Sequence, residues 1–245
     1  MRVLLNLRSL KNCSYKLEPG KLQGLIYNLL KDSGYSGLHD KPGYKFFCFS
    51  NIFPIGDFKE GDSRNLLISS PDPYFVRILE SALTTKTSLN IGELQFNITS
   101  IKTLKPRIGN NSKIISATPI VIRIPEKNYG KYGIPEEKRK KSYLFWRPEY
   151  PFEAFVRQME DNLFKKYNQF YSKQIQPFPL FEQFRFKKSV ASSIKKDGRE
   201  HVEIGSIWEF EFSHLSREQR EILEFGIDCG FGERNSYGFG FVNLV

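Results

Sequence analysis

The chain ends in the stretch GFGERNSYGFGFVNLV, residues 230–245, in which two Gly-Phe-Gly triplets flank a five-residue polar segment. Glycine lets the backbone adopt positive φ angles and lets another chain approach it closely. Glycine-rich loops that hold a mononucleotide lead into a helix whose N-terminus binds the phosphate. Only five residues follow Gly240. We therefore expect a loop that leads into a terminal strand, suited to a phosphodiester chain rather than to a mononucleotide.

This glycine pattern resembles that of a known family. The form GFGERNSYGFGFV, residues 230–242, resembles the glycine-rich loop of the repeat-associated RNA-binding superfamily of CRISPR proteins. It is most similar to the loop of the members that cut CRISPR precursor RNA, the Cas six endoribonucleases. The alternative interpretation is a hairpin punctuated by glycine, with its phenylalanines packed in a core.

The charge of the chain narrows the class of partner. A net charge of +10 over 245 residues favours a polyanion, although charge alone does not separate RNA, DNA and an acidic membrane. The sequence has no apolar stretch of about 18 residues, so it predicts no membrane span. Its cysteines, Cys13, Cys48 and Cys229, form no disulfide framework, which predicts free thiols and a cytoplasmic protein.

Metal chemistry is not predicted. The sequence contains neither an HExxH motif nor Cys/His zinc spacing, so we expect no metal and no cofactor. The acidic residues Asp57, Glu60 and Asp62 lie in a glycine-containing stretch, which we interpret as a solvated turn.

The first half of the sequence predicts the order strand, helix, strand, strand, helix, strand. Strands are expected at Val3–Leu7, Tyr44–Phe49, Arg64–Ser69 and 93–104. The first helix has its apolar residues at helical spacing, at Leu22, Leu25, Ile26, Leu29 and Leu30. Asp72 and Pro73 supply an N-cap and a first-turn proline for the second helix.

The second half repeats this order. Strands are expected at Thr118–Ile124, at 181–190 and 202–212 as a long hairpin, and in the last apolar run. Phe152 to Tyr167 carries the apolar stripe of a long helix. Ser216 and Gln219 form a capping box for another helix.

Two such βαββαβ units in tandem predict an α+β fold of two ferredoxin-like (RRM-like) domains, which is also what the CRISPR resemblance implies. Pro106, Gly109, Asn110 and Asn111 cluster near the middle and suggest the boundary. Residues 1–110 are expected to form the N-terminal domain with the active site. Residues 111–245 are expected to form the C-terminal domain with a basic hairpin and the glycine-rich loop.

The resemblance also implies catalytic residues. The family's first helix begins with the pattern L-x-G-L-I-Y-N, matched here by residues 22–28, and a loop histidine follows it, matched by His39. An imidazole exchanges protons near neutral pH. Family members pair this histidine with the helix tyrosine, here Tyr27, and with a lysine before the next strand, here Lys45; Lys41 competes for that position. From the apolar stripe, Tyr27 is expected off the core face of its helix. The alternatives are a solvated loop histidine and an ordinary surface tyrosine.

The reaction implied by the resemblance is cleavage of RNA without a metal. The ribose 2′-OH attacks the adjacent phosphorus and leaves a 2′,3′-cyclic phosphate and a 5′-OH. His39 would transfer a proton, as base or as acid. Lys45 would offset the charge of the phosphorane, and Tyr27 would orient the 2′-OH or the phosphate.

Basic residues of the predicted hairpin suggest an RNA path. Arg185 lies between Phe184 and Phe186, and cations mixed with aromatics suit phosphate contact and base stacking. In the resembled family this hairpin and the glycine-rich loop grip the repeat RNA. The expected RNA-binding residues are Arg185, Lys187, Lys188, Lys195, Lys196, Arg199, Gly230, Gly232, Arg234, Gly238 and Gly240.

Two other functions stay open at this point. A non-catalytic relative that binds repeat RNA or scaffolds an effector complex would carry the same loop. An unrelated RRM protein is a further alternative, although GFGFV at 238–242 lacks the leading basic residue of the RRM motif. The expected partners are CRISPR repeat RNA, as precursor or processed guide, and subunits of a CRISPR interference complex, with the chain as monomer or homodimer.

Overall fold

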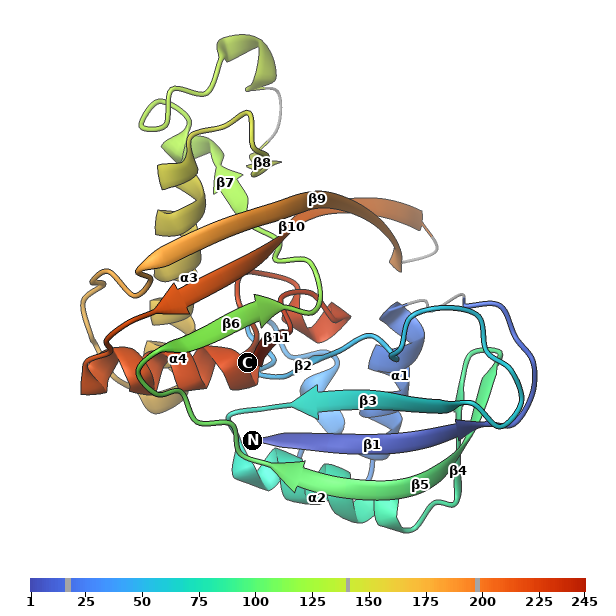
Figure 1. Ribbon diagram of the computed structural model, residues 1–245. Coiled ribbons are helices and arrows are strands. Elements are labelled where there is room, and N and C mark those ends of the chain that lie inside the picture. Colours follow the sequence, from blue (N-terminus) through green and yellow to red (C-terminus); the bar gives the residue numbers. More distant parts are fainter. Residues whose placement is uncertain (16–18, 140–141, 197–198) are drawn as a thin grey trace. The chain divides into compact units, whose positions relative to one another are not determined.

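The computed structural model of the protein describes residues 1–15, 19–139, 142–196 and 199–245, which form two compact units (Figure 1). The N-terminal unit contains Met1–Pro106 together with Ser236–Gly238. The C-terminal unit contains Arg107–Asn235 and Phe239–Val245. Three residues of the glycine-rich loop therefore belong to the N-terminal unit.

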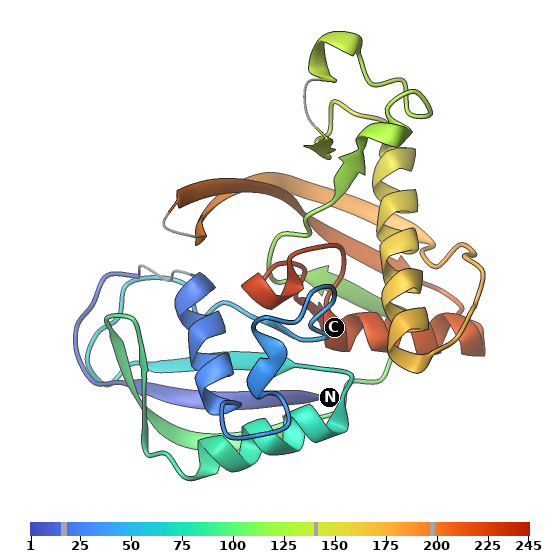
Figure 2. The ribbon, with the colours of Figure 1, turned by 180° about the vertical axis from the view of Figure 1, so that it is seen from behind.

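The N-terminal unit has an antiparallel sheet in the order β2-β3-β1-β5-β4. Its strands are β1 (Arg2–Ser9), β2 (Cys48–Phe49), β3 (Ser63–Ser69), β4 (Ser88–Ile91) and β5 (Leu94–Leu104). Helices α1 (Pro19–Leu29) and α2 (Pro73–Thr84) lie on one face of this sheet (Figure 2). Without β4, which adds a hairpin to β5, the order and directions are those of a ferredoxin-like fold.

Local sequence explains these elements. Alternation along β1 places Val3, Leu5 and Leu7 in the core under the helices, where each is 0–1% exposed. Pro73 opens α2, and the Asp72 carboxylate accepts hydrogen bonds from the amides of Tyr74 and Phe75, at 2.9 and 3.4 Å. The predicted cap of this helix is confirmed.

The C-terminal unit has a second antiparallel sheet in the order β11-β6-β10-β9. Its strands are β6 (Ser112–Ser116), β9 (Gln183–Lys196), β10 (Arg199–Phe212) and β11 (Val242–Leu244). Helices α3 (Phe152–Tyr171) and α4 (Arg217–Cys229) cover one face (Figure 2). A small two-stranded sheet of β7 (Arg123–Pro125) and β8 (Tyr143–Phe145) is inserted between β6 and α3. The order β6-α3-β9-β10-α4-β11 completes the second ferredoxin-like domain, so the predicted fold class is confirmed.

Two predicted strands are wrong in extent. The strand expected at Thr118–Ile124 is not a strand of the sheet, whose first strand in this unit is β6; it meets β10 at an isolated antiparallel bridge between Ile120 and Ser206. Pro119 lacks the N–H that a central strand needs. The carbonyl of Pro119 instead accepts a hydrogen bond from Gly240 N at 2.8 Å, and the carbonyl of Val121 accepts one from Glu233 N at 2.9 Å. This segment therefore supports the glycine-rich loop.

The strand expected at Tyr44–Phe49 is also shorter than predicted, since only Cys48–Phe49 pairs with β3. Phe46 has a φ of +52° and Gly43 a φ of +84°, so the backbone before β2 is not extended. The aromatic residues before Cys48, which suggested a long strand, therefore lie in a loop.

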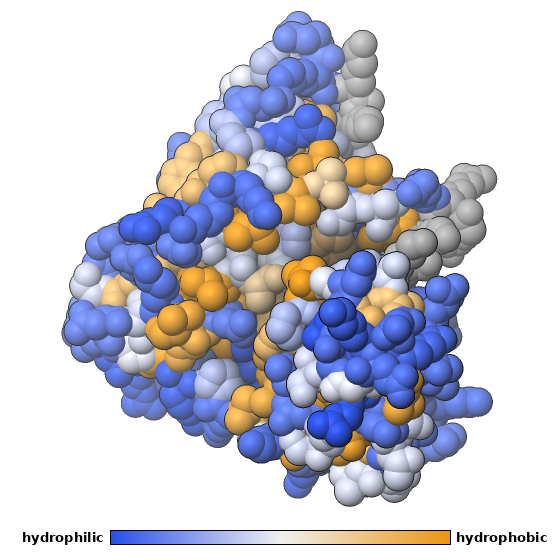
Figure 3. All heavy atoms as spheres, turned by 45° about the vertical axis from the view of Figure 1, so that its right-hand side comes forward, coloured by the Kyte–Doolittle hydropathy of each residue, from blue (hydrophilic) through white to orange (hydrophobic). Residues whose placement is uncertain are grey.

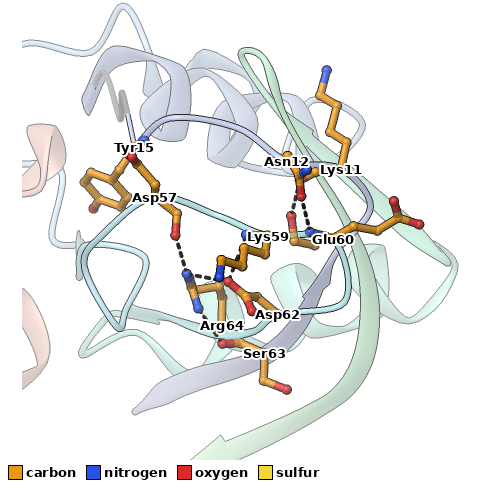
Figure 4. Close-up of polar contacts among 10 residues, drawn as sticks. Lys11, Asn12, Tyr15, Asp57, Lys59, Glu60, Asp62, Ser63 and Arg64 are labelled. Carbon is orange, nitrogen blue, oxygen red and sulfur yellow. Dashed lines mark hydrogen bonds and ion pairs between the residues drawn. The ribbon is translucent and has the colours of Figure 1, made fainter.

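The acidic stretch before β3 is more ordered than the solvated turn we expected (Figure 4). Arg64, 9% exposed, donates to the Asp57 carbonyl at 2.9 Å and to Asp62 Oδ2 at 3.0 Å. The Asp57 carboxylate accepts from Tyr15 N at 2.9 Å, and Asn12 Oδ1 accepts from Glu60 N at 2.8 Å. These contacts tie the turn to the segment after β1.

Hydrophilic residues dominate the face drawn in Figure 3, with apolar residues in separate patches. Among the helices that the structure describes, none combines the length and apolarity needed to cross a membrane.

Candidate functional site

Tyr27 lies on α1 next to the buried Ile26 and is half-buried. Its ring meets the ring of His39 edge-on, with centroids 5.1 Å apart, and that of Phe47 at 5.9 Å. The expectation that Tyr27 lies off the core was therefore only partly right, because its ring packs against the edge of the N-terminal core. This packing fixes the direction of the phenol.

The Tyr27 hydroxyl has polar neighbours within the N-terminal unit. Gln23, one turn earlier on α1, lies with its Nε2 3.5 Å from the hydroxyl and donates to the Ser236 carbonyl at 2.9 Å. Burial is the main cause that raises the pKa of Tyr27 to about 12, and the nearby Tyr237 phenol also raises it. A hydrogen bond with Ser236 acts in the opposite direction. The phenol is thus neutral at physiological pH and can donate a hydrogen bond.

His39 follows a 3₁₀ turn, Ser36–Leu38, in the loop between α1 and β2. Its side chain is 69% exposed, and Nδ1 lies 2.7 Å from the Asp40 carboxylate. With Nδ1 donating to the carboxylate, Nε2 is the nitrogen left for proton transfer with a substrate. The loop histidine is therefore accessible and oriented by both Tyr27 and Asp40.

Lys45 folds back onto the same loop. Its ammonium donates to the carbonyls of Leu38 at 2.5 Å and His39 at 2.9 Å, and to that of Lys41. Desolvation lowers the pKa of Lys45, and nearby Lys41 lowers it further, whereas Asp40 raises it. Lys45 therefore places positive charge beside His39 and also fixes the backbone that carries it. Lys41 is exposed in the same loop.

The predicted RNA-binding cations of β9 have partners inside the C-terminal unit. Lys187 Nζ lies 2.8 Å from Glu209 Oε1 on β10, and Arg185 Nη1 lies 3.7 Å from Glu209 Oε2. Their charge, Lys187 above all, lowers the pKa of Glu209. Lys188 is exposed on the same strand. The backbone is described for Lys195, Lys196 and Arg199, which lie in the paired ends of β9 and β10, but their side chains lie outside the described part of the chain.

The interleaved aromatics do not share a face with these cations, contrary to our expectation of a stacking surface. Phe184 packs against Phe152 of α3 and Phe210 of β10, with ring centroids 4.9 and 5.8 Å apart. Phe186, 39% exposed, contacts Trp208 at 5.2 Å. Side chains alternate along a strand, so these phenylalanines face the helices. Arg185 and Lys187 face the other way, toward Glu209.

The glycine-rich loop is shaped by close internal packing. Positive φ angles between 65° and 90° occur at Gly230, Gly232, Gly238 and Gly240. A Cβ on Gly240 would lie 1.9 Å from the Phe231 carbonyl oxygen, so only glycine fits there. Arg234, also at positive φ, has its Nε 3.1 Å from Glu203 Oε1, and Glu203 is only 3% exposed. The protein's own atoms thus account for the close approaches in this loop.

Two buried polar residues near these loops were missed from the sequence. Gln23, 9% exposed, occupies the variable position of the helix motif, where no role was expected. Lys166, 2% exposed, donates to oxygen atoms of the glycine-rich loop. A signal for Lys166 did exist, because it lies three residues after Leu163 on the apolar stripe of α3.

The sequence family described as "CRISPR associated protein Cas6, C-terminal" matches residues 102–244. The chain belongs to the Cas6 family. A Cas6 relative from Methanocaldococcus jannaschii, named CRISPR-associated endoribonuclease Cas6 2, is 33% identical, and the alignment covers 100% of both chains.

Solved structures show the same fold at lower identity. A structure described as CRISPR associated protein Cas6 has a TM-score of 0.72 at 23% identity, covering 100% of this chain and 99% of its own. Another, described as a RAMP protein binding different RNA substrates, has a TM-score of 0.71 at 21% identity, with the same coverage. These neighbours support the tandem ferredoxin-like architecture.

Proposed function

We propose that this Cas6 family member is an endoribonuclease that cuts CRISPR repeat RNA without a metal, using Tyr27, His39 and Lys45. The observation that carries this proposal is the edge contact of the Tyr27 and His39 rings, 5.1 Å apart, beside a loop to which the Lys45 ammonium is bonded. Phosphodiester cleavage by a 2′-OH needs proton transfer and stabilisation of negative charge, which an imidazole, an ammonium and a phenol donor can supply. The name of the relative from Methanocaldococcus jannaschii, an endoribonuclease, supports the same activity.

In the proposed reaction the ribose 2′-oxygen bonds to the adjacent phosphorus as the bond from phosphorus to the 5′-oxygen breaks. The products are a 2′,3′-cyclic phosphate and a 5′-OH. His39 Nε2 either takes the proton of the 2′-OH or gives one to the departing 5′-oxygen, while Asp40 holds Nδ1 at 2.7 Å. Proton transfer of this kind contributes roughly 10²–10⁴-fold to the rate.

Tyr27 and Lys45 act on charge and orientation. The Tyr27 phenol, whose pKa of about 12 keeps it protonated, donates a hydrogen bond to the phosphate or the 2′-oxygen. The Lys45 ammonium offsets the extra negative charge of the phosphorane. Lys41, exposed in the same loop, is the competing source of this charge.

RNA binding is assigned to the C-terminal half. The exposed cations Arg185, Lys187 and Lys188 on β9 and the hairpin tip beyond them provide phosphate contacts. Arg234 of the glycine-rich loop, whose Nε lies 3.1 Å from Glu203 Oε1, is a further phosphate contact in this proposal. Partial neutralisation of Arg185 and Lys187 by Glu209 means that phosphate must compete with a carboxylate for them.

The test uses purified protein and end-labelled repeat RNA in EDTA. A second RNA carries one 2′-deoxy nucleotide immediately upstream of the cut. The proposal predicts cleavage at one site, a 2′,3′-cyclic phosphate on the upstream fragment, and no cleavage of the 2′-deoxy RNA. Binding of the repeat without cleavage, with or without added metal, would show instead a binding subunit. Cleavage of the 2′-deoxy RNA would contradict the mechanism.

A further inference from the structure

A buried lysine of α3 is bonded to the glycine-rich loop. Lys166 is 2% exposed, and its ammonium donates to the carbonyls of Gly230 at 2.6 Å and Gly232 at 3.0 Å, and to Asn235 Oδ1 at 3.0 Å. An ammonium has three N–H donors, so these oxygens match its hydrogen-bonding capacity. All four residues belong to the C-terminal unit.

Asn235 extends this contact to both glycine triplets. Its Nδ2 donates to the carbonyls of Phe231 and Phe239, at 3.0 Å each. A lysine can only donate and a carbonyl can only accept, so these partners fix the orientation of the amide. Lys166 and Asn235 therefore form one hydrogen-bonded unit that spans residues 230–239.

Burial of the Lys166 ammonium disfavours folding unless its hydrogen bonds to the glycine-rich loop compensate. Burying an ammonium disfavours folding strongly when it is not fully hydrogen-bonded. Lys166 continues the buried, otherwise apolar stripe of α3 through Met159 and Leu163. Gly230 closes α4, and carbonyls at the C-terminal end of a helix carry partial negative charge that favours a cation.

We propose that Lys166 is a positioning residue for RNA recognition, which holds the glycine-rich loop in its RNA-binding conformation. This inference rests on the proposed function, because it assumes that the loop contacts repeat RNA. A loop already ordered in the free protein loses little conformational entropy when the ligand binds. Without the ammonium, these three oxygens lose a charged donor, and the RNA itself must supply more of the ordering of the loop.

The test compares Lys166→Met with Lys165→Met, which makes the same chemical change at the neighbouring exposed lysine of α3. In Lys166→Met, amides of residues 230–241 should exchange hydrogen faster, and the Kd for repeat RNA should rise about tenfold, while kcat falls less than threefold. Lys165→Met should stay within about twofold of wild type in all three measurements. The hydrogen-exchange readout needs no RNA, so it separates failure of this inference from failure of the proposed function.

A second variant protects the test against misfolding. If thermal unfolding shows that Lys166→Met does not fold, Asn235→Ala, which removes the other half of the unit, takes its place with the same expected changes. Where both variants fold, the double variant should lose much less than the sum of the two single losses. A folded Lys166→Met or Asn235→Ala with wild-type loop exchange and wild-type RNA affinity would overturn the inference.

Discussion

Two loops of this Cas6 family member differ in how they are held. The loop around His39 is open, with the histidine side chain 69% exposed and its backbone held by a lysine from the same loop. The glycine-rich loop is fixed from inside, by Lys166, which is 2% exposed. The contrast fits a division of labour, in which the side chains proposed to be catalytic stay accessible and the loop proposed to bind RNA is shaped in advance.

The glycines of the two loops give the largest expected difference. A Cβ on Gly37 would meet nothing within 4 Å, whereas a Cβ on Gly240 would lie 1.9 Å from the Phe231 carbonyl oxygen, at a φ of +69°. Gly240→Ala should lower the free energy of unfolding by about 3 kcal/mol or more. Gly37→Ala should change it by less than about 0.5 kcal/mol. Urea unfolding of both variants checks this, and equal effects would remove the structural contrast.

The second prediction concerns the lysines of the His39 loop. Lys45→Met should slow cleavage of bound repeat RNA about 100-fold, because it removes charge beside the phosphorane and the ties to the loop carbonyls. Lys41→Met should slow it less than threefold if Lys45 supplies the charge. Single-turnover rates at saturating protein measure both. The reverse order of effects would assign the role to Lys41.

Tyr27→Phe keeps the ring contact with His39 and removes the hydroxyl. We expect cleavage to slow about tenfold, equivalent to roughly 1.4 kcal/mol, because one hydrogen bond to the reacting group is lost. RNA affinity should change less than twofold. A wild-type cleavage rate in Tyr27→Phe would reduce Tyr27 to a packing residue for the imidazole.

The smallest expected effect is on the fall of the cleavage rate at alkaline pH, the alkaline limb of its pH profile. Because the pKa of Lys45 is lowered from 10.5, its ammonium loses charge at a lower pH than an ordinary lysine. Its stabilisation of the phosphorane is present below that pKa and is lost as the pH rises through it. The limb should persist in Tyr27→Phe, since the pKa of Tyr27 is raised to about 12, and disappear in Lys45→Met. A limb unchanged in Lys45→Met would show that another group titrates.

Features that depend on residues close together in the sequence were predicted correctly. The Asp72 cap and the capping box of Ser216 and Gln219 are confirmed, because both are contacts within one helical turn. The true first strand of the C-terminal unit, Ser112–Ser116, begins directly after the predicted domain boundary, in a segment for which no strand was expected. The apolar run of this strand is short. The longer apolar run at Thr118–Ile124 gives the stronger strand signal, although its backbone bonds to the glycine-rich loop.

Contacts between residues far apart in sequence could not be predicted. Nothing local indicates that Lys166 meets Gly230, 64 residues away, or that the loop near Ser236 reaches Gln23, 213 residues away. The family resemblance implied that Tyr27 and His39 belong to one site, but the contact between their rings was not predicted. In the β9 segment Phe184 and Arg185 are consecutive, so the alternation of a strand already places their side chains on opposite faces.

The division of labour is tested most directly with His39→Ala, measured for both affinity and cleavage of repeat RNA. The account predicts that the single-turnover rate falls roughly 10²–10⁴-fold while the Kd stays within about twofold of wild type. His214→Ala, at an exposed histidine before α4, is the matched control and should change neither quantity. Wild-type cleavage by His39→Ala, or a loss of binding that explains the whole loss of cleavage, would contradict the account.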